Sequence, residues 1–203
     1  VDDVLLIGDM RKCRTVFADL KKHLKIREVG AMEKVGDSLQ YLGRPLEMTE
    51  KGYTMEANPK QIDIIVKEQK VEMAKKVDTP VVKYTEGQLN QAEDLDAKRA
   101  TLYKAGLGKE MYIAWDRPDL QYTVMMASRA ASHPTVIEEQ RLKRMAKYLS
   151  HRRRVVWGCE LQEGPETIKV YTGSDWAGDR PGRRSASGGI LCFGPAAVRG
   201  WSK

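Results

Sequence analysis

The spacing of apolar residues changes along this chain of 203 residues, and the change restricts the folds it can adopt. From Leu95 to His151 apolar side chains recur every three or four residues, which predicts amphipathic helices. From residue 155 onward, short apolar runs alternate with turns rich in Gly and Ser, which predicts β-strands. Helices and strands that gather in separate blocks predict an α+β fold.

Two breaks that contain proline divide the helical part. The segments LDAKRATLYKAGLGKEMYIAW and DLQYTVMMASRAAS each predict a helix, with DRPD at residues 116–119 between them. Pro118 suits the first position of a helix, and it biases Arg117 towards extended geometry. Beyond His133-Pro134 a third helix is predicted by a stripe of four apolar residues, Ile137, Leu142, Met145 and Leu149.

The remaining segments predict shorter elements. MRKCRTVFADLKKHLK predicts an amphipathic helix that packs through Val16, Phe17, Leu20 and Leu24. SLQYLGRPLEMTEKGYTMEA predicts two strands around a turn at 49–52, and Asn58-Pro59 predicts the start of a helix. The polar segment 77–96 is expected to be a connection. VVWGCEL, TIKVYT and GGILCF predict three strands near the C-terminus.

The chain opens with VDDVLLIGD, where two adjacent carboxylates precede four apolar residues. Residues 4–7 predict a short strand buried on both faces. Neighbouring carboxylates such as Asp2 and Asp3 repel each other unless solvent, a cationic partner or a metal ion stabilises them. The pair is therefore either an exposed turn or an acidic metal site at the tip of a hairpin.

Positive charge is concentrated in one segment. Residues 141–154, RLKRMAKYLSHRRR, hold seven basic residues and no acidic one, which equals the formal net charge of +7 for the whole chain. Such a block favours contact with polyanions, of which nucleic acid phosphates are the usual kind. A solvated helix face is the alternative interpretation of the same charges.

Cysteine usage and hydropathy exclude several classes of protein. Cys13, Cys159 and Cys192 are far apart and form no CxxC pair, so neither a disulfide framework nor a zinc site is predicted. No apolar run approaches the ~18 residues that a membrane span needs. The N-terminus lacks the order of a signal peptide, so we expect a protein of a reducing compartment that is not secreted.

Five blocks, taken in order, resemble the copia-type retrotransposon Pol polyprotein. They are VDDVLLIGD, YLG, MYIAWDRPDLQYTV, HPT with RLKRMAKYL, and SDWAGDRPGRRSASGG with GWSK. The resemblance covers nearly the whole chain and implies three parts. Residues 1–76 would be the C-terminal part of a reverse transcriptase palm, 77–154 a helical thumb and connection with a basic face, and 155–203 the N-terminal part of a ribonuclease H-like domain.

The resemblance also implies roles for particular residues. Asp2 and Asp3 look like the tail of the polymerase YVDD turn, which holds Mg²⁺ (or Mn²⁺) for nucleotidyl transfer, with Asp2 the better ligand candidate. The hairpin with Tyr41 and Gly43 looks like the element that positions the primer. Six basic residues would contact the backbone of a template–primer duplex: Lys143, Arg144, Lys147, Arg152, Arg153 and Arg154.

The ribonuclease H part departs from the family pattern. The family sequence SDADWAGD, aligned on DWAGD, places Asp175 at its second aspartate and Gly173 at its first. Because glycine has no side chain with which to bind a metal, nuclease activity depends on Asp175 alone in this part. Both catalytic sites are incomplete in this sequence, so we expect the fragment to be inactive by itself.

The resulting interpretation is a fragment of an RNA-directed DNA polymerase with the start of its ribonuclease H. Implied partners are an RNA template, a DNA primer, their hybrid, deoxynucleoside triphosphates and the rest of the Pol polyprotein, in the cytoplasm within a virus-like particle or in the nucleus, and not at a membrane. The alternative is a decayed retroelement that acts at most as a nucleic-acid-binding module. A third possibility is a structural domain without a ligand.

Overall fold

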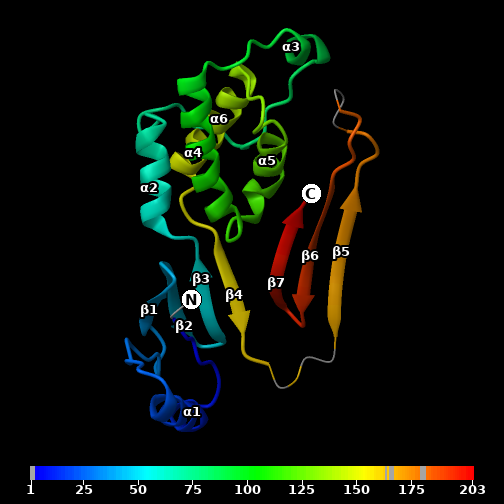
Figure 1. Ribbon diagram of the computed structural model, residues 1–203. Coiled ribbons are helices and arrows are strands. Elements are labelled where there is room, and N and C mark those ends of the chain that lie inside the picture. Colours follow the sequence, from blue (N-terminus) through cyan, green and yellow to red (C-terminus); the bar gives the residue numbers. More distant parts are fainter. Residues whose placement is uncertain (1–2, 163, 165–166, 179–181) are drawn as a thin grey trace.

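The computed structural model describes residues 3–162, 164, 167–178 and 182–203. These residues form a group of packed helices and two antiparallel sheets (Figure 1). The predicted α+β class is confirmed.

The helices are α1 (Met10–His23), α2 (Pro59–Glu68), α3 (Glu86–Asn90), α4 (Ala97–Ala114), α5 (Pro118–Arg129) and α6 (Val136–His151). The strands are β1 (Ser38–Tyr41), β2 (Arg44–Thr49), β3 (Gly52–Glu56), β4 (Val156–Glu160), β5 (Ile168–Ser174), β6 (Ser187–Phe193) and β7 (Ala196–Ser202). The first sheet has the order β1-β2-β3-β4 and the second β5-β6-β7, with every pairing antiparallel.

The main core lies between α2, α4, α5 and α6. All four residues of the predicted α6 stripe are buried, and Leu142, Met145 and Leu149 belong to this core, as helical periodicity requires. Pro118 is the first residue of α5, as predicted, and Arg117 before it lies outside the helical region, at φ −125° and ψ 80°. Asn58 caps α2 by accepting a hydrogen bond from the Lys60 amide, which confirms the predicted start of that helix.

The first sheet has more strands than the sequence predicted. The stretch expected to form two strands forms three, because a second tight turn at Leu42-Gly43 separates β1 from β2. Leu42 and Gly43 both have positive φ, 51° and 77°, as a two-residue hairpin turn requires. Leucine rarely adopts this conformation, so local propensity gave no turn signal, and only the family resemblance implied a hairpin with Tyr41 and Gly43.

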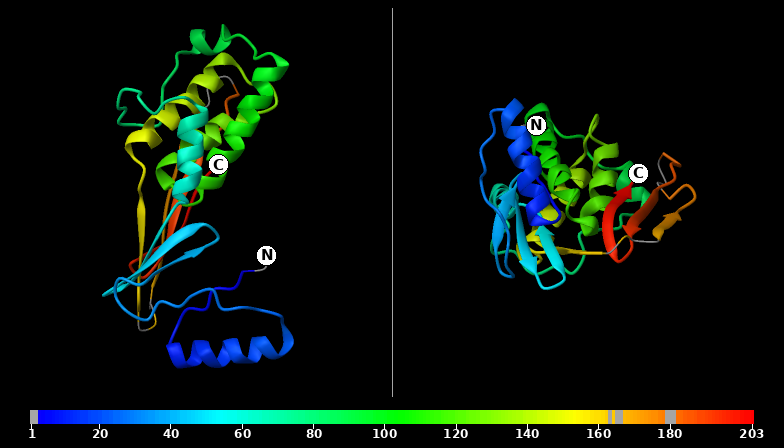
Figure 2. Two further views of the ribbon diagram at one scale, coloured as in Figure 1. Left: turned by 90° about the vertical axis from the view of Figure 1, so that its left-hand side faces the viewer. Right: turned by 90° about the horizontal axis from the view of Figure 1, so that it is seen from below.

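The N-terminal segment differs most from the prediction. Residues 4–7 form no strand, and Val4 and Ile7 are 60% and 57% exposed, so the predicted strand buried on both faces is wrong for this chain. A strand needs neighbours that pair with its backbone, and no described strand pairs with this segment. Helix α1 forms as predicted but buries none of its residues, and it projects away from the helical group (Figure 2).

Strand β4 pairs with β3, so it completes the first sheet and does not join the strands that follow it. The division of the chain into three parts at residues 76 and 154 stays a prediction. Strand β7 was not predicted. It pairs with β6, and β5 forms the outer edge of the second sheet with all seven of its residues exposed. Over the part of the chain that the structure describes, no helix is long and apolar enough to cross a membrane.

Candidate functional site

The acidic turn lies beside the β1–β2 hairpin. Asp3 is exposed, and its backbone carbonyl oxygen accepts a hydrogen bond of 3.5 Å from the Tyr41 hydroxyl. Asp2, the better metal-ligand candidate, lies outside the described residues. The structure thus brings Asp3 and Tyr41 together, two residues that are 38 positions apart in the sequence.

The hairpin in turn contacts the end of α4. The Tyr112 hydroxyl donates a hydrogen bond of 3.3 Å to the carbonyl oxygen of Leu42. At Gly43, a Cβ atom would lie 2.4 Å from Nδ2 of Asn58, and the φ of +77° is unfavourable for other residues. Gly43 is therefore required by this turn and by the close approach of the α2 cap.

Beyond the hairpin, α4 and the residue that follows it present aromatic side chains to solvent. Tyr112 and Trp115 are 42% and 62% exposed, and the Arg199 guanidinium of β7 lies 5.5 Å from the centre of the Trp115 ring. Lys104 is exposed on the same side of α4, since eleven residues before Trp115 is close to three helical turns. We call Lys104, Tyr112, Trp115 and Arg199 the α4 aromatic face.

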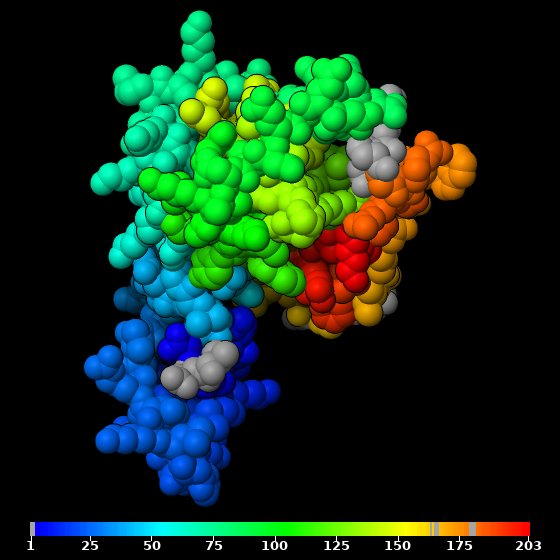
Figure 3. Space-filling view, turned by 45° about the horizontal axis from the view of Figure 1, so that its top comes forward, coloured from blue at the N-terminus to red at the C-terminus, as the bar shows by residue number. Residues whose placement is uncertain are grey.

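Sequence reasoning missed this face because it predicted the helix without assigning a role to its exposed side. A signal was available, since Lys104, Met111 and Trp115 recur with helical spacing on a side that lacks the residues of the core. In Figure 3 green atoms of the helical part lie between the light-blue atoms of the hairpin region and the red atoms of the C-terminal strand, on one side of the molecule.

The basic segment is divided by its contacts. Arg144 donates to the carbonyl oxygen of Thr79 at 3.0 Å, Arg153 pairs with Asp63 of α2, and Arg154 pairs with Glu56 of β3 at 2.5 and 2.8 Å. Arg141, the first basic residue of the segment, pairs with Glu138 at 2.9 Å. The remaining three cations make no ion pair with any residue in the described ranges, and we call them the unpaired cations: Lys143, Lys147 and Arg152.

A buried guanidinium holds the backbone of this segment. Arg117 is fully buried and pairs with Asp119 through two bonds of 3.0 and 2.8 Å. It also donates to the carbonyl oxygens of Arg152 at 2.9 Å and Arg153 at 3.4 Å, at the C-terminal end of α6, where a cation is favoured. Burial raises the pKa of Asp119, but the bonds from Arg117 outweigh it and leave that pKa lowered.

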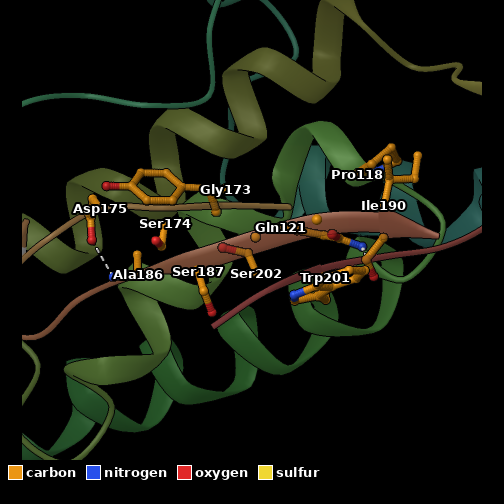
Figure 4. A pocket seen from close by; sticks show the side chains of 14 residues that line it. Pro118, Gln121, Gly173, Ser174, Asp175, Ala186, Ser187, Ile190, Trp201 and Ser202 are labelled. Atoms are coloured by element: carbon orange, nitrogen blue, oxygen red, sulfur yellow. Dashed lines mark hydrogen bonds between the residues drawn. The ribbon is translucent and has the colours of Figure 1, made fainter. Parts of the chain in front are cut away.

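Asp175 lines a separate pocket of about 420 Å³ between α5 and the second sheet (Figure 4). Its carboxylate accepts a hydrogen bond of 2.5 Å from the Ala186 amide, and its own amide donates to the Ala186 carbonyl oxygen at 2.9 Å. The carboxylate also lies so close to Gly178 that a Cβ there would approach it to 1.9 Å. Asp175 thus joins the end of β5 to Ala186, which directly precedes β6.

The position aligned with the missing aspartate is open. Gly173 lines the same pocket, and an added Cβ would meet no atom within 4 Å. An aspartate at 173 therefore has room beside the pocket that Asp175 also lines.

The acidic candidates do not converge on one metal site. Among the residues that the structure describes, no group of three or more His, Cys, Asp or Glu side chains could hold a metal ion. Mg²⁺ requires several oxygen ligands in near-octahedral geometry, so Asp3 and Asp175, at separate places, do not form its site alone.

One carboxylate lies in the helical core and belongs to none of the surfaces described above. Glu110 of α4 is 1% exposed, and neither of its carboxylate oxygens has a hydrogen-bond partner among the described residues. Burial raises the pKa of Glu110 well above its usual value, because the charged form is poorly solvated there.

Comparisons with known proteins show similarity to proteins encoded by transposons. It is 26% identical over 205 residues to the retrovirus-related Pol polyprotein from transposon RE1 of Arabidopsis thaliana, and 26% identical over 211 residues to that from transposon TNT 1-94 of Nicotiana tabacum. Both alignments cover the whole chain, which spans 13% and 15% of the lengths of these polyproteins.

A third relative, secreted RxLR effector protein 161 of Plasmopara viticola, is 35% identical over 103 residues, covering 50% of this chain and 71% of that protein. No family model and no solved structure matches the chain. The whole-chain alignments agree with the motifs: the chain is similar over its full length to retrovirus-related Pol polyproteins from transposons, which supports the resemblance to a retrotransposon Pol fragment.

Proposed function

We propose that this chain is the part of a retrotransposon reverse transcriptase that runs from the catalytic turn through the thumb and connection to the start of ribonuclease H. In this proposal it binds the RNA–DNA hybrid formed during template-directed synthesis. The observation that carries it is a continuous series of contacts from Asp3 to Tyr41, across the turn to Leu42 and Tyr112, and on to the α4 aromatic face.

The chemistry of this face suits a nucleic acid. Exposed aromatic rings stack on bases and sugars, and each base stacked on an aromatic ring contributes about 1–3 kcal/mol. Lys104 and Arg199 at either end are placed to contact phosphates without reading sequence. Because the neighbouring acid on α4, Glu110, is buried, the exposed charge of the face is positive.

The unpaired cations offer a second surface, which the sequence alone favoured. In Figure 1 helix α6, which carries Lys143 and Lys147, lies behind α4. Since Arg153 and Arg154 already pair with Asp63 and Glu56, fewer cations are available for phosphates than the sequence suggested. The α4 aromatic face is therefore our first candidate for the hybrid.

The test is a titration of a fluorescent RNA–DNA hybrid with the chain at several salt concentrations. Trp115→Ala should weaken binding about tenfold, in line with the loss of one stacking contact. Trp176→Ala is the matched control, because Trp176 is also exposed and has the Arg183 guanidinium 5.9 Å from its ring centre, but lies in the loop that follows β5. Equal binding by wild type and Trp115→Ala would remove the α4 aromatic face from the proposal.

Catalysis belongs to the longer polyprotein in this proposal. There Asp2 and Asp3 would contribute ligands to Mg²⁺ or Mn²⁺, together with acidic residues from outside this chain. Primer extension by a full-length Pol protein should be lost with Asp2→Asn, and unchanged extension would remove Asp2 from the site. A decayed element would still bind the hybrid but would show no extension in its natural sequence.

A further inference from the structure

An ion pair joins the β1–β2 hairpin to the end of α4. The Nε atom of Arg44 donates to Oδ2 of Asp116 at 2.7 Å. Arg44 is the first residue of β2, directly after the Leu42-Gly43 turn, and Asp116 directly follows Trp115. The pair therefore connects the two parts of the proposed nucleic-acid surface at their point of contact.

The pair is shielded from water. The side chains of Arg44 and Asp116 are 20% and 7% exposed, whereas those of the surface pair Lys22–Asp19 of α1, also 2.7 Å long, are 68% and 65% exposed. Ion pairs in full contact with solvent contribute little, but removing one partner of a shielded pair leaves an unpaired charge away from water. Burial raises the pKa of Asp116, and Arg44 opposes this by favouring the carboxylate.

Two further contacts meet at the same place. The indole Nε1 of Trp157, on β4, donates to the carbonyl oxygen of Asp116 at 2.7 Å, and the Tyr112 hydroxyl bonds the hairpin at Leu42. The backbone of Asp116 is thus held by Trp157 of β4, and its carboxylate holds Arg44 of β2. Of these three contacts, the one between Arg44 and Asp116 is ionic.

We propose that Arg44 and Asp116 are a positioning pair, which holds the β1–β2 hairpin against α4 so that Tyr41 and the α4 aromatic face form one nucleic-acid surface. The inference rests on the proposed function, since its consequence is tighter binding of the hybrid. Neither residue is catalytic, and the pair acts through the hairpin it orders.

A distance measurement separates this role from general stability. Spin labels are placed on cysteines at Gln40 of β1 and Lys98 of α4, both exposed, after Cys13, Cys159 and Cys192 are replaced by Ser. With Asp116→Asn the distribution of label distances should broaden. Asp19→Asn, which removes the charge of the exposed pair in α1, should leave it unchanged.

Binding of the RNA–DNA hybrid is measured on the same variants. Asp116→Asn should weaken it about tenfold. The exchange Arg44→Asp with Asp116→Arg rebuilds the pair in reverse and should restore the narrow distribution and most of the affinity. Circular dichroism confirms that each variant is folded, and Arg44→Gln provides a second test if Asp116→Asn is not.

The outcomes distinguish the two proposals. Unchanged distances in both Asp116→Asn and Arg44→Gln would overturn the positioning pair, whatever happens to binding. Broadened distances with full affinity would overturn its role in binding. If the wild-type chain does not bind the hybrid, the proposed function fails, while the distances still decide whether the pair holds the hairpin.

Discussion

Replacing Glu110 by methionine should stabilise the helical group. The carboxyl group is 1% exposed and both its oxygens lack hydrogen-bond partners among the described residues, and a buried polar group left unpaired costs about 1–3 kcal/mol even when neutral. Methionine has a similar length and fills irregular space in a core without a polar oxygen. We therefore expect Glu110→Met to gain about 1–3 kcal/mol at low pH, or a few degrees in Tm for a chain of this size.

The stability that Glu110→Met gains over the wild type should increase with pH. Since the pKa of Glu110 is raised in the folded state, the wild type is most stable with respect to this group below the unfolded pKa of about 4.3. Its stability then falls as pH rises from that value towards the folded pKa, by up to about 1.4 kcal/mol per pH unit, because the unfolded state releases the proton first. Glu110→Met lacks this loss, so the difference between the two proteins widens over the same window.

Urea denaturation of both proteins at a series of pH values above ~4 measures the effect. Glu110→Gln should remove the pH dependence, but it should stabilise the chain less than Glu110→Met because the buried amide stays without a hydrogen-bond partner. Glu72→Met, at an exposed site after α2, is the control and should follow the wild-type pH profile. If plots of unfolding free energy against pH run parallel for wild type and Glu110→Met, the assignment of a buried, unpaired carboxyl group is refuted.

Three further predictions concern the surfaces. Gly43→Ala should destabilise the chain by about 1–3 kcal/mol, since the positive φ and the nearby Asn58 both oppose a Cβ, and thermal unfolding detects this. Gly173→Asp should fold normally and increase Mn²⁺ binding measured by electron paramagnetic resonance, whereas unchanged binding would show that the pocket does not gather metal ligands. If all three unpaired cations contact phosphates, replacing them by Gln should reduce the slope of log affinity on log salt by about 2.7, and an unchanged slope would exclude them from the interface.

The helical part of the fold was predictable because local signals decided it. Pro118 ended one helix and started the next, and the stripe through Leu142 and Met145 identified the buried side of α6. The strands were harder to predict. The turn at Leu42 uses a backbone conformation that leucine rarely adopts, and β7 contains Arg199 and Gly200, which give a weak strand pattern.

The candidate site was only partly accessible from the sequence. The motifs identified Asp3, Tyr41 and Asp175 as candidates but gave no distances between them. The pairing of Arg154 with Glu56, 98 residues earlier, could not be inferred, because it depends on β4 returning to β3. Trp115 was missed because exposed and buried aromatics share the same helical spacing until the packing partners of the helix are known.

The outer edge of β5 has a practical consequence. Its seven residues are exposed and carry one charged side chain, Lys169, so a row of backbone amides and carbonyls stays accessible to any extended peptide. Natural sheets protect such edges with charges, prolines or covering segments to avoid aggregation. Concentrated samples of this chain should therefore self-associate through β5. Val170→Lys adds a second charge to this edge and should keep the samples monomeric.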